Sequence, residues 1–234
     1  ENIHSDTVRA RESDLDQKLL YDWHRRASLL DHFLGANVTL DDYYRAAYQE
    51  LGDFVDQPYQ HNVISKKGEI ALRLSRDGHV WQGAALLPVS VEKMITIGPD
   101  SDNIAVTYTI ANGDGIRLDT RFGIEFNWGL AGGDQLAHAY VQMGDGQYSL
   151  GEQSNHSEIT ALSIRSDLWK LSVSLEWDHK SHLWWFPLET ISNSEAGFER
   201  NYQGTTMLLW WPVALAPGES WRVTLSASLG YLNK

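Results

Sequence analysis

The spacing of hydrophobic residues along the chain changes near Gly52. Before this residue, apolar side chains recur every three or four positions, which is the spacing of one face of an α-helix. After it, apolar and polar residues alternate, which is typical of a β-strand with one buried face. The pattern therefore predicts a helical connector over residues 1–52 and a β domain over residues 53–234.

Capping signals divide the connector into two predicted helices. Ser13 is a candidate N-cap for the first helix, and Gly35 follows its last periodic position. Thr39, with Asp42 three residues later, begins the second helix, and Gly52 ends it. Two helices of this length are typical of a hairpin or linker rather than of a domain.

Alternation is longest over residues 118–128, where apolar side chains share one face and polar residues, including Glu125, share the other. Asp77-Gly78 and the run from Asn112 to Gly115 are turn signals between such segments. Roughly a dozen strands of this kind need two packed layers to bury their apolar faces. The predicted fold is mainly β: a large antiparallel β-sandwich preceded by a short helical segment.

Composition excludes several classes of function. The 234 residues include 31 acidic and 19 basic side chains, and the resulting net charge of -12 would repel nucleic acid. Cysteine is absent, which excludes disulfides and thiolate catalysis and mildly favours the cytoplasm. No apolar run approaches the roughly 20 residues that span a bilayer, so no membrane partner is expected. The first residues hold neither an initiator Met nor a signal-peptide core, as expected for an excised or processed chain.

Standard catalytic motifs are missing, so no catalytic residue is predicted. Glu125 could pair with a second carboxylate, or with His138 or His179 to open an aldose ring, but nothing in the sequence selects a partner. His24 and His32 are too far apart for the i, i+4 spacing of helical zinc ligands, so no metal site is predicted.

Calcium is the one cofactor left open. The acidic turns over residues 100–103 and 112–115 offer the hard oxygen ligands that calcium prefers, although neither has the EF-hand spacing. Ordinary turn chemistry is the favoured explanation for both segments.

Aromatic pairs are the better candidates for ligand contact. Trp184 and Trp185, and likewise Trp210 and Trp211, point to opposite faces of a strand, so we expect one ring of each pair to face away from the core. Such a ring could stack on a sugar, for which Glu125 is a further candidate contact, or it could fill an interface between sheets or domains. The candidates for contact with a neighbouring domain lie in the connector: Trp23, Arg25, Asp31 and His32.

Four segments of the chain are similar to one known family. Residues 21–33, 52–55, 122–127 and 197–204 resemble the C-terminal region of α-amylase/4-α-glucanotransferase enzymes of glycoside hydrolase family 57. The resemblance spans nearly the whole chain. It implies an N-terminal (β/α)7 barrel with a Glu nucleophile and an Asp acid/base, then a helical segment, then a β-sandwich like that of galactose mutarotase.

Only the last part of this arrangement matches the present chain, so no catalytic residue can be assigned from the family. The resemblance implies a non-catalytic domain that supports the upstream barrel and contacts α-glucan or maltooligosaccharide. Two alternatives stay open: an independent carbohydrate-binding module, and a mutarotase-like enzyme that epimerises aldoses.

Overall fold

The computed structural model describes residues 15, 19–66, 68–99, 101–113, 115–194 and 197–232. Within these residues the chain forms twelve strands and one short α-helix. The elements are β1 (Leu30–Leu34), α1 (Leu40–Tyr44), β2 (Gln60–Lys66), β3 (Glu69–Gln82), β4 (Ala85–Ile97), β5 (Asn103–Asn112), β6 (Leu118–Trp128), β7 (Ala139–Met143), β8 (Gly146–Ser149), β9 (Ser154–Ser166), β10 (Leu171–Ser194), β11 (Gly197–Leu215) and β12 (Ser220–Tyr231). The described helix is too short to cross a membrane.

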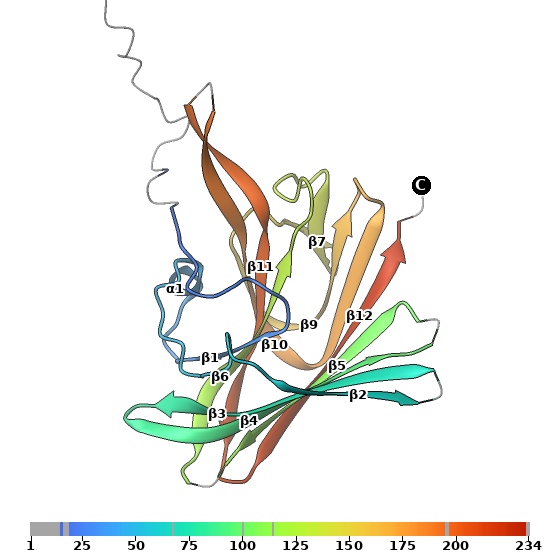
Figure 1. The fold of residues 1–234 in the computed structure, drawn as a ribbon. Coiled ribbons are helices and arrows are strands. Elements are labelled where there is room, and N and C mark those ends of the chain that lie inside the picture. Colours follow the sequence, from blue (N-terminus) through green and yellow to red (C-terminus); the bar gives the residue numbers. More distant parts are fainter. Residues whose placement is uncertain are drawn as a thin grey trace, which may run out of the picture.

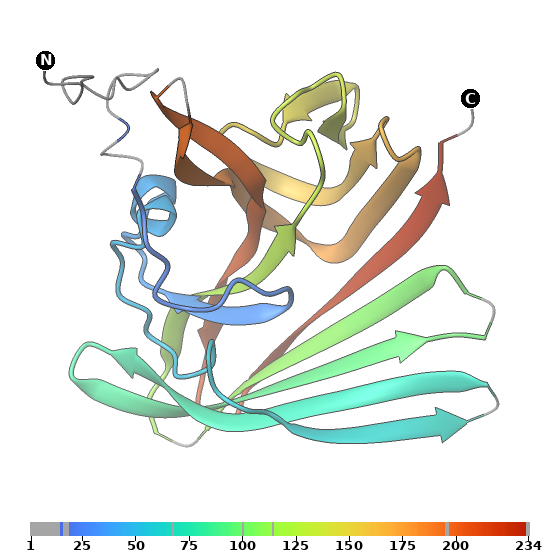
Figure 2. The same ribbon diagram turned by 45° about the horizontal axis from the view of Figure 1, so that its top comes forward.

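The strands form one continuous sheet that folds over on itself. Its order is β1-β6-β11-β10-β12-β5-β4-β3-β2, with β9 beside β10 and β7 between β9 and β8. Each described pairing is antiparallel. Strands β1, β6, β11 and β10 lie on one side, β5 to β2 lie on the other, and β12 runs between them (Figure 1; Figure 2). The predicted antiparallel sandwich is confirmed, although its two layers are parts of one sheet.

An apolar core fills the space between the two layers, and we call it the inner cluster. Alternate residues of most strands point into it, such as Phe122 and Ile124 of β6 opposite Trp211 and Leu209 of β11. Val223 of β12 lies in the same cluster and is fully buried. The alternation in the sequence therefore marked the inward faces correctly.

The two predicted helices are wrong for the described part of the connector. Residues 19–29 are not helical, residues 30–34 form strand β1, and only Leu40–Tyr44 is α-helical. Strand β1 pairs with β6, and this pairing outweighs the weak helical periodicity of the same residues. The second start signal is correct, because Thr39 and Asp42 form a capping box at the beginning of α1. Ser13, the other predicted N-cap, lies outside the described residues.

The turn predicted at Asp77-Gly78 is also wrong. Both residues lie inside β3, where Gly78 pairs with Val89, and the chain turns instead at Gly83, whose φ is 62°. A Cβ at Gly78 would meet Asp53 Oδ1 and would lie 2.7 Å from the Phe54 ring. Glycine is therefore needed because an aromatic ring packs directly on the backbone, a reason that turn statistics do not capture. The turn after Asn112 is confirmed by the end of β5 at this residue.

A second apolar cluster lies on the opposite face of strands β6, β11 and β10, and we call it the outer cluster. Residues 19–51, which we call the lead-in, cover it. The lead-in contributes Leu34, Tyr43 and Tyr44, while the strands contribute Phe186 and Leu208. Phe33 and Leu34 in β1 point to opposite sides, so Phe33 joins the inner cluster and Leu34 the outer one. The lead-in is thus integrated into the sandwich.

Candidate functional site

A buried carboxylate lies under the lead-in, beside the outer cluster. Ile124 and Phe126 point inward from β6, so Glu125 between them points outward, where the lead-in covers it completely. A buried charge is costly unless it is paired and hydrogen-bonded. The surroundings of Glu125 therefore decide whether this carboxylate is structural or reactive.

Five side chains bind the Glu125 carboxylate, and we call this group the Glu125 cluster. The contacts are His24 Nε2 at 3.2 Å, Arg26 Nη1 at 2.9 Å, His32 Nε2 at 3.2 Å, Asn127 Nδ2 at 2.7 Å, and the hydroxyl of Tyr43, which donates a hydrogen bond. Burial alone would raise the pKa of Glu125, but the hydrogen bonds from the two histidines and the charge of Arg26 hold this pKa far below its usual range. Glu125 is a fixed anion rather than a proton donor.

His32 lies between two carboxylates. Its Nδ1 is 2.9 Å from Glu50 Oε2, and its Nε2 is 3.2 Å from Glu125 Oε2. Burial would lower the pKa of His32, but these two carboxylates outweigh burial and raise it to about 9. Both ring nitrogens of the imidazolium then donate hydrogen bonds. Glu50 is held in turn by the backbone N–H of Phe33, at 2.6 Å, and that of Gly52, at 3.2 Å.

Among the described residues, His24, His32 and Glu125 hold ligand atoms that all lie within 4.8 Å of one another, a donor set that a divalent metal could use. The remaining contacts argue against a metal. The guanidinium of Arg26 and the hydroxyl of Tyr43 already bind the same carboxylate, and a charged His32 has no lone pair to offer. The geometry fits an ion-pair cluster that fastens the lead-in to the sandwich.

A second buried ion pair holds the lead-in at the start of β1. Lys93 Nζ of β4 lies 2.7 Å from Asp31 Oδ2, and the hydroxyl of Tyr59 donates to the same carboxylate. Lys93 also donates to the carbonyl of Leu29 at 2.6 Å, and Leu29 has a left-handed φ of 64°. Leu29 N donates to the carbonyl of Glu125 at 2.7 Å, which fixes this strained residue from both sides.

The residues predicted to contact a neighbouring domain fall into two groups. Asp31 and His32 are buried within the chain, so the prediction that they contact another domain is wrong for this structure. Their ion pairs bind the lead-in to strands of the same chain. Trp23 and Arg25 are exposed and stay candidates for such a contact.

The tryptophan pairs do alternate between faces, as predicted, but none of the four rings faces solvent. Trp185 and Trp211 lie in the inner cluster, and Trp184 and Trp210 lie in the outer cluster. Each ring is at most 6% exposed. The expected exposed ring is absent because the lead-in covers the outward face that the alternation left free. Glu125 is also fully buried, so a sugar cannot reach its carboxylate.

The sequence left open a histidine partner for Glu125 and a calcium site in the acidic turns. Glu125 does have histidine partners, but these are His24 and His32 rather than His138 or His179. In the turn after β5, the side chain of Asn112 donates to the carbonyls of Ile116 and Leu215, both at 3.0 Å, which is a structural role. Asp100 and Asp114 of the acidic turns lie outside the described residues, and calcium binding stays a prediction.

Sequence reasoning missed Arg26, Tyr43, Glu50 and Lys93. Arg26 is paired with Asp22 at 2.6 Å, as its i, i+4 spacing allows, but the pair forms without a helix. The one available signal was Glu125 itself: an acidic side chain in the middle of a long strand needs either solvent or several partners. The partners come from about 100 positions earlier in the chain, a distance that local patterns cannot bridge.

A known protein family matches almost the whole chain. The family described as "Alpha-amylase/4-alpha-glucanotransferase, C-terminal" matches residues 1–225. The chain belongs to this family. The similarity that the four sequence segments indicated is thereby confirmed.

Individual relatives agree with this assignment. The chain is 30% identical over 200 residues to a 4-alpha-glucanotransferase of Thermococcus litoralis, covering 86% of the chain and 26% of that protein. The crystal structure of 4-alpha-glucanotransferase from Thermococcus litoralis superposes with a TM-score of 0.72 at 26% identity, covering 93% of this chain and 29% of that one. The chain therefore spans about a quarter of the length of the curated relatives it matches.

A more distant likeness concerns the fold alone. A galactose mutarotase-like protein from Clostridium acetobutylicum superposes with a TM-score of 0.52 at 7% identity, covering 74% of this chain and 67% of that one. The predicted mutarotase-like sandwich is confirmed as a fold.

Proposed function

We propose that this chain is the non-catalytic C-terminal β-sandwich of an α-1,4-glucan-active enzyme, of α-amylase or 4-α-glucanotransferase type, and that it supports the catalytic barrel of the same polypeptide. The observation that carries the proposal is the closure of the Glu125 cluster. The carboxylate is fully buried and has five side-chain partners, so it cannot protonate or attack a glycosidic bond.

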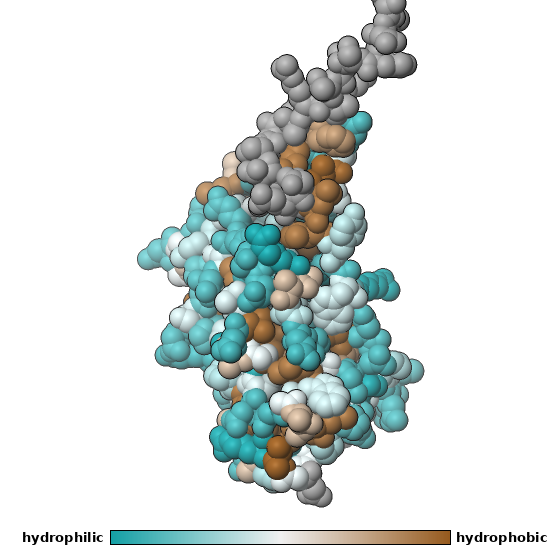
Figure 3. Space-filling view, turned by 90° about the vertical axis from the view of Figure 1, so that its left-hand side faces the viewer, coloured by the Kyte–Doolittle hydropathy of each residue, from teal (hydrophilic) through white to brown (hydrophobic). Residues whose placement is uncertain are grey.

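The exposed side of the lead-in is the surface that we assign to the barrel contact. Leu19, Tyr21 and Trp23 are 53%, 83% and 44% exposed, and Arg25 is exposed beside them. Figure 3 shows the side of the molecule on which α1 and β1 lie, where hydrophobic groups are scattered between hydrophilic ones. A mixed surface of this kind is typical of contacts between domains of one chain. The centroids of the Trp23 and His24 rings are 4.5 Å apart, so Trp23 packs directly on the Glu125 cluster.

Product analysis tests the non-catalytic role. The purified chain is incubated with maltoheptaose, and the products are separated by chromatography. We expect neither shorter nor longer oligosaccharides. Product formation that disappears in a Glu125→Gln variant, provided that this variant is folded, would contradict the proposal.

The barrel contact needs its own experiment. The chain is mixed with the catalytic part encoded upstream in the same reading frame, and association is measured by analytical ultracentrifugation. We expect a complex that weakens in Trp23→Ala, whereas Trp169→Ala, which changes another exposed tryptophan, leaves the association unchanged. Failure of the two parts to associate would contradict the supporting role.

A mutarotase-like activity is the second candidate because the fold agrees with it. Opening an aldose ring needs an acid and a base that reach the sugar, and the Glu125 cluster is closed to solvent. We therefore expect no acceleration of α/β-glucose interconversion in polarimetry.

The absence of cysteine favours the cytoplasm as the location of the enzyme, which cell fractionation tests.

A further inference from the structure

The apolar face of the inner cluster continues outward along β12, β5, β4, β3 and β2. Two rows of directly paired residues cross these strands, and we call them the open face: a first row of Val63, Leu72, Ile95, Val106 and Leu225, and a second row of Ile70, Ile97, Ile104 and Ala227. Exposure along the first row rises from 3% at Leu225 to 62% at Val63. In the second row, Ile70, Ile97 and Ile104 are 51%, 40% and 41% exposed.

The open face is exposed because the two layers of the sheet diverge. Strands β2 to β5 separate from β9 and β10 on the side of the molecule opposite the lead-in (Figure 1; Figure 2). Near β12, Val106 and Leu225 still belong to the inner cluster. Toward β2 the same face loses this cover, although its residues stay apolar. Monomeric proteins rarely expose apolar patches larger than a few hundred Å², and larger patches mark interaction sites.

The other face of the same strands is polar. Thr107 of β5 and Thr224 of β12 form a hydrogen bond of 3.2 Å, and Arg73 of β3 donates to Glu92 of β4 at 2.7 Å. An antiparallel sheet with one solvated face normally alternates in this way, with its apolar side chains on the covered face. The alternation of β2 to β5 therefore indicates that the open face is covered by a partner.

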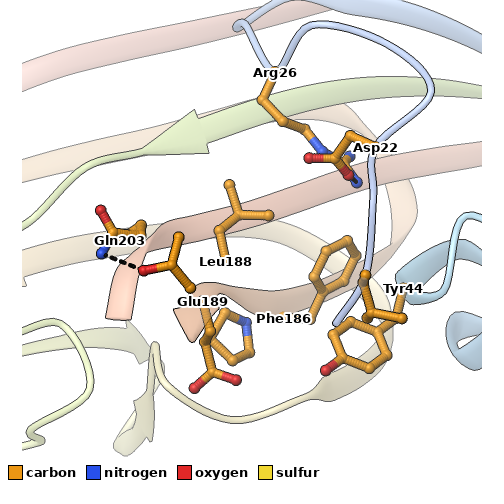
Figure 4. Close-up of a pocket in the computed structure, with 10 residues that line it drawn as sticks. Asp22, Arg26, Tyr44, Phe186, Leu188, Glu189 and Gln203 are labelled. Carbon is orange, nitrogen blue, oxygen red and sulfur yellow. Dashed lines mark hydrogen bonds and ion pairs between the residues drawn. The ribbon is translucent and has the colours of Figure 1, made fainter. Parts of the chain in front are cut away.

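The side chains of the open face limit what this partner can be. All members of the two rows are aliphatic, so they offer a sugar or an ion no hydrogen bonds. The pocket between the lead-in and the β10–β11 hairpin is more polar, but its groups bind one another (Figure 4). Asp22 pairs with Arg26 at 2.6 Å, and Gln203 donates to Thr190 at 3.1 Å. The open face thus requires an apolar protein surface.

A second copy of this chain is the partner that fits. The barrel contact proposed above lies on the lead-in, at the opposite side of the molecule, so it leaves the open face uncovered. A net charge of -12 opposes contact between most parts of two identical surfaces. The open face carries no charge, so two such faces meet without opposing like charges. Two faces about five strands wide and two rows deep bury roughly 700 Å² together, which is the range of reversible complexes.

We propose that two copies of this chain pack their open faces against each other about a two-fold axis and form a reversible dimer. Such a contact is isologous, because the same patch is used by both copies. Packed sheets lie about 10 Å apart, a spacing that aliphatic side chains from both faces fill. This inference goes beyond the proposed function and uses it only to exclude the barrel as the partner.

Sedimentation velocity of the 234-residue chain tests the dimer. The mass should be 26.5 kDa at low micromolar concentration and should approach twice this value toward millimolar concentration. Ile97→Lys brings like charges into the interface and should weaken dimerisation at least about tenfold. Thr96→Lys is the matched control, because Thr96 is the neighbouring residue on the polar face and its substitution should leave the dimer unchanged.

Thiol protection gives a second measurement that does not depend on the folding of Ile97→Lys. The chain has no cysteine, so Ile97→Cys and Thr96→Cys each carry a single thiol. Alkylation by iodoacetamide is followed at a low and a high concentration of the chain. We expect the thiol of Ile97→Cys to react more slowly at the high concentration, and that of Thr96→Cys to react at the same rate at both.

A chain that stays monomeric at the highest concentration overturns the proposal, as does equal weakening by Thr96→Lys and Ile97→Lys. Unchanged reactivity of the thiol in Ile97→Cys overturns it too. Loss of the dimer in Trp23→Ala would move the interface to the lead-in. Protection of that thiol only after the upstream catalytic part is added would make the barrel the partner, which also overturns the proposal. None of these outcomes contradicts the non-catalytic role, which product analysis tests.

Discussion

The two faces of strands β6, β11 and β10 are buried in different ways. The inner cluster is filled by apolar side chains from both layers of the sheet. The outer cluster is also apolar, but it lies beside Glu125 and four largely buried charged or histidine side chains of the lead-in, namely His24, Arg26, His32 and Glu50. The inner face is stabilised by contacts that many apolar residues can make. The outer face depends on one carboxylate and its particular partners.

Two equally buried residues of one strand can therefore differ in the substitutions that they tolerate. Ile124 and Glu125 are neighbours in β6, and both are fully buried. Replacing an apolar residue leaves a cavity, whereas replacing one member of a buried ion cluster leaves charges without partners. The four predictions that follow test this difference, beginning with the largest expected effect.

Glu125→Gln should have the largest effect. The variant keeps the shape of the side chain but leaves Arg26 and a charged His32 without their counter-charge, which we expect to lower the free energy of unfolding by about 3–5 kcal/mol. Urea denaturation followed by tryptophan fluorescence measures the change. Glu176→Gln, at an exposed carboxylate of β10, is the matched control and should stay within about 0.5 kcal/mol of the parent. Equal effects of the two substitutions would show that the Glu125 cluster stabilises nothing.

The second prediction concerns pH. His32 has an ordinary pKa of 6.5 when unfolded and about 9 when folded, so its contribution to stability is complete below pH 6.5. As pH rises through about 9, the folded state loses this proton and the contribution disappears. The rise in pKa corresponds to roughly 3 kcal/mol in total. Urea midpoints between pH 6 and pH 9.5 should therefore fall for the parent chain.

His32→Gln should remove most of this slope, because the glutamine does not titrate. His79→Gln, at an exposed histidine of β3, is the control that should retain it. A parent chain whose stability is flat between pH 6.5 and pH 9 would contradict the assignment of a charged imidazole between Glu50 and Glu125.

Gly78→Ala tests the packing of the inner cluster with a smaller expected effect. The added Cβ would meet Asp53 Oδ1 and, at 2.7 Å, the ring of Phe54, which belongs to the inner cluster. We expect a loss of about 1–3 kcal/mol without a change in the pH dependence. Gly129→Ala is the matched control, because a Cβ there meets no atom within 4 Å. Thermal unfolding measures the loss. If both substitutions lower the unfolding temperature equally, the close packing at Gly78 does not contribute to stability.

Trp23→Ala should have the smallest effect on stability. Trp23 is 44% exposed, and its ring contacts His24 and Tyr48, so we expect a loss below about 1 kcal/mol. Thermal unfolding of the isolated chain measures it. A loss as large as that of Glu125→Gln would show that Trp23 is part of the Glu125 cluster rather than a docking residue.

Much of the sandwich could be predicted from the sequence because its strands are long and alternate regularly. Residues 118–128 were predicted as one strand with a single core face, and β6 covers the same residues. The capping box at Thr39 was also readable, since it depends on two residues only three positions apart.

The lead-in and the candidate site could not be predicted, because their structure depends on contacts that are distant in sequence. Leu30–Leu34 has apolar residues at helical spacing but forms a strand through its pairing with β6. Gly78 appeared to mark a turn, whereas its role is to accommodate Phe54. Glu125 could be recognised as unusual, but its partners His24, Arg26 and Tyr43 are set by the tertiary fold alone.

Strand β1 also protects the edge of the sheet. It pairs with β6 from Leu30↔Glu125 to Leu34↔Arg121, which occupies backbone groups that would otherwise be free to pair with another chain. A fragment that begins at residue 53 would present β6 as an open edge, with a carboxylate and the rings of Trp184 and Trp210 uncovered beside it. Such a fragment is expected to self-associate through edge pairing, so the first residue of a shortened chain decides its solubility more than its length does.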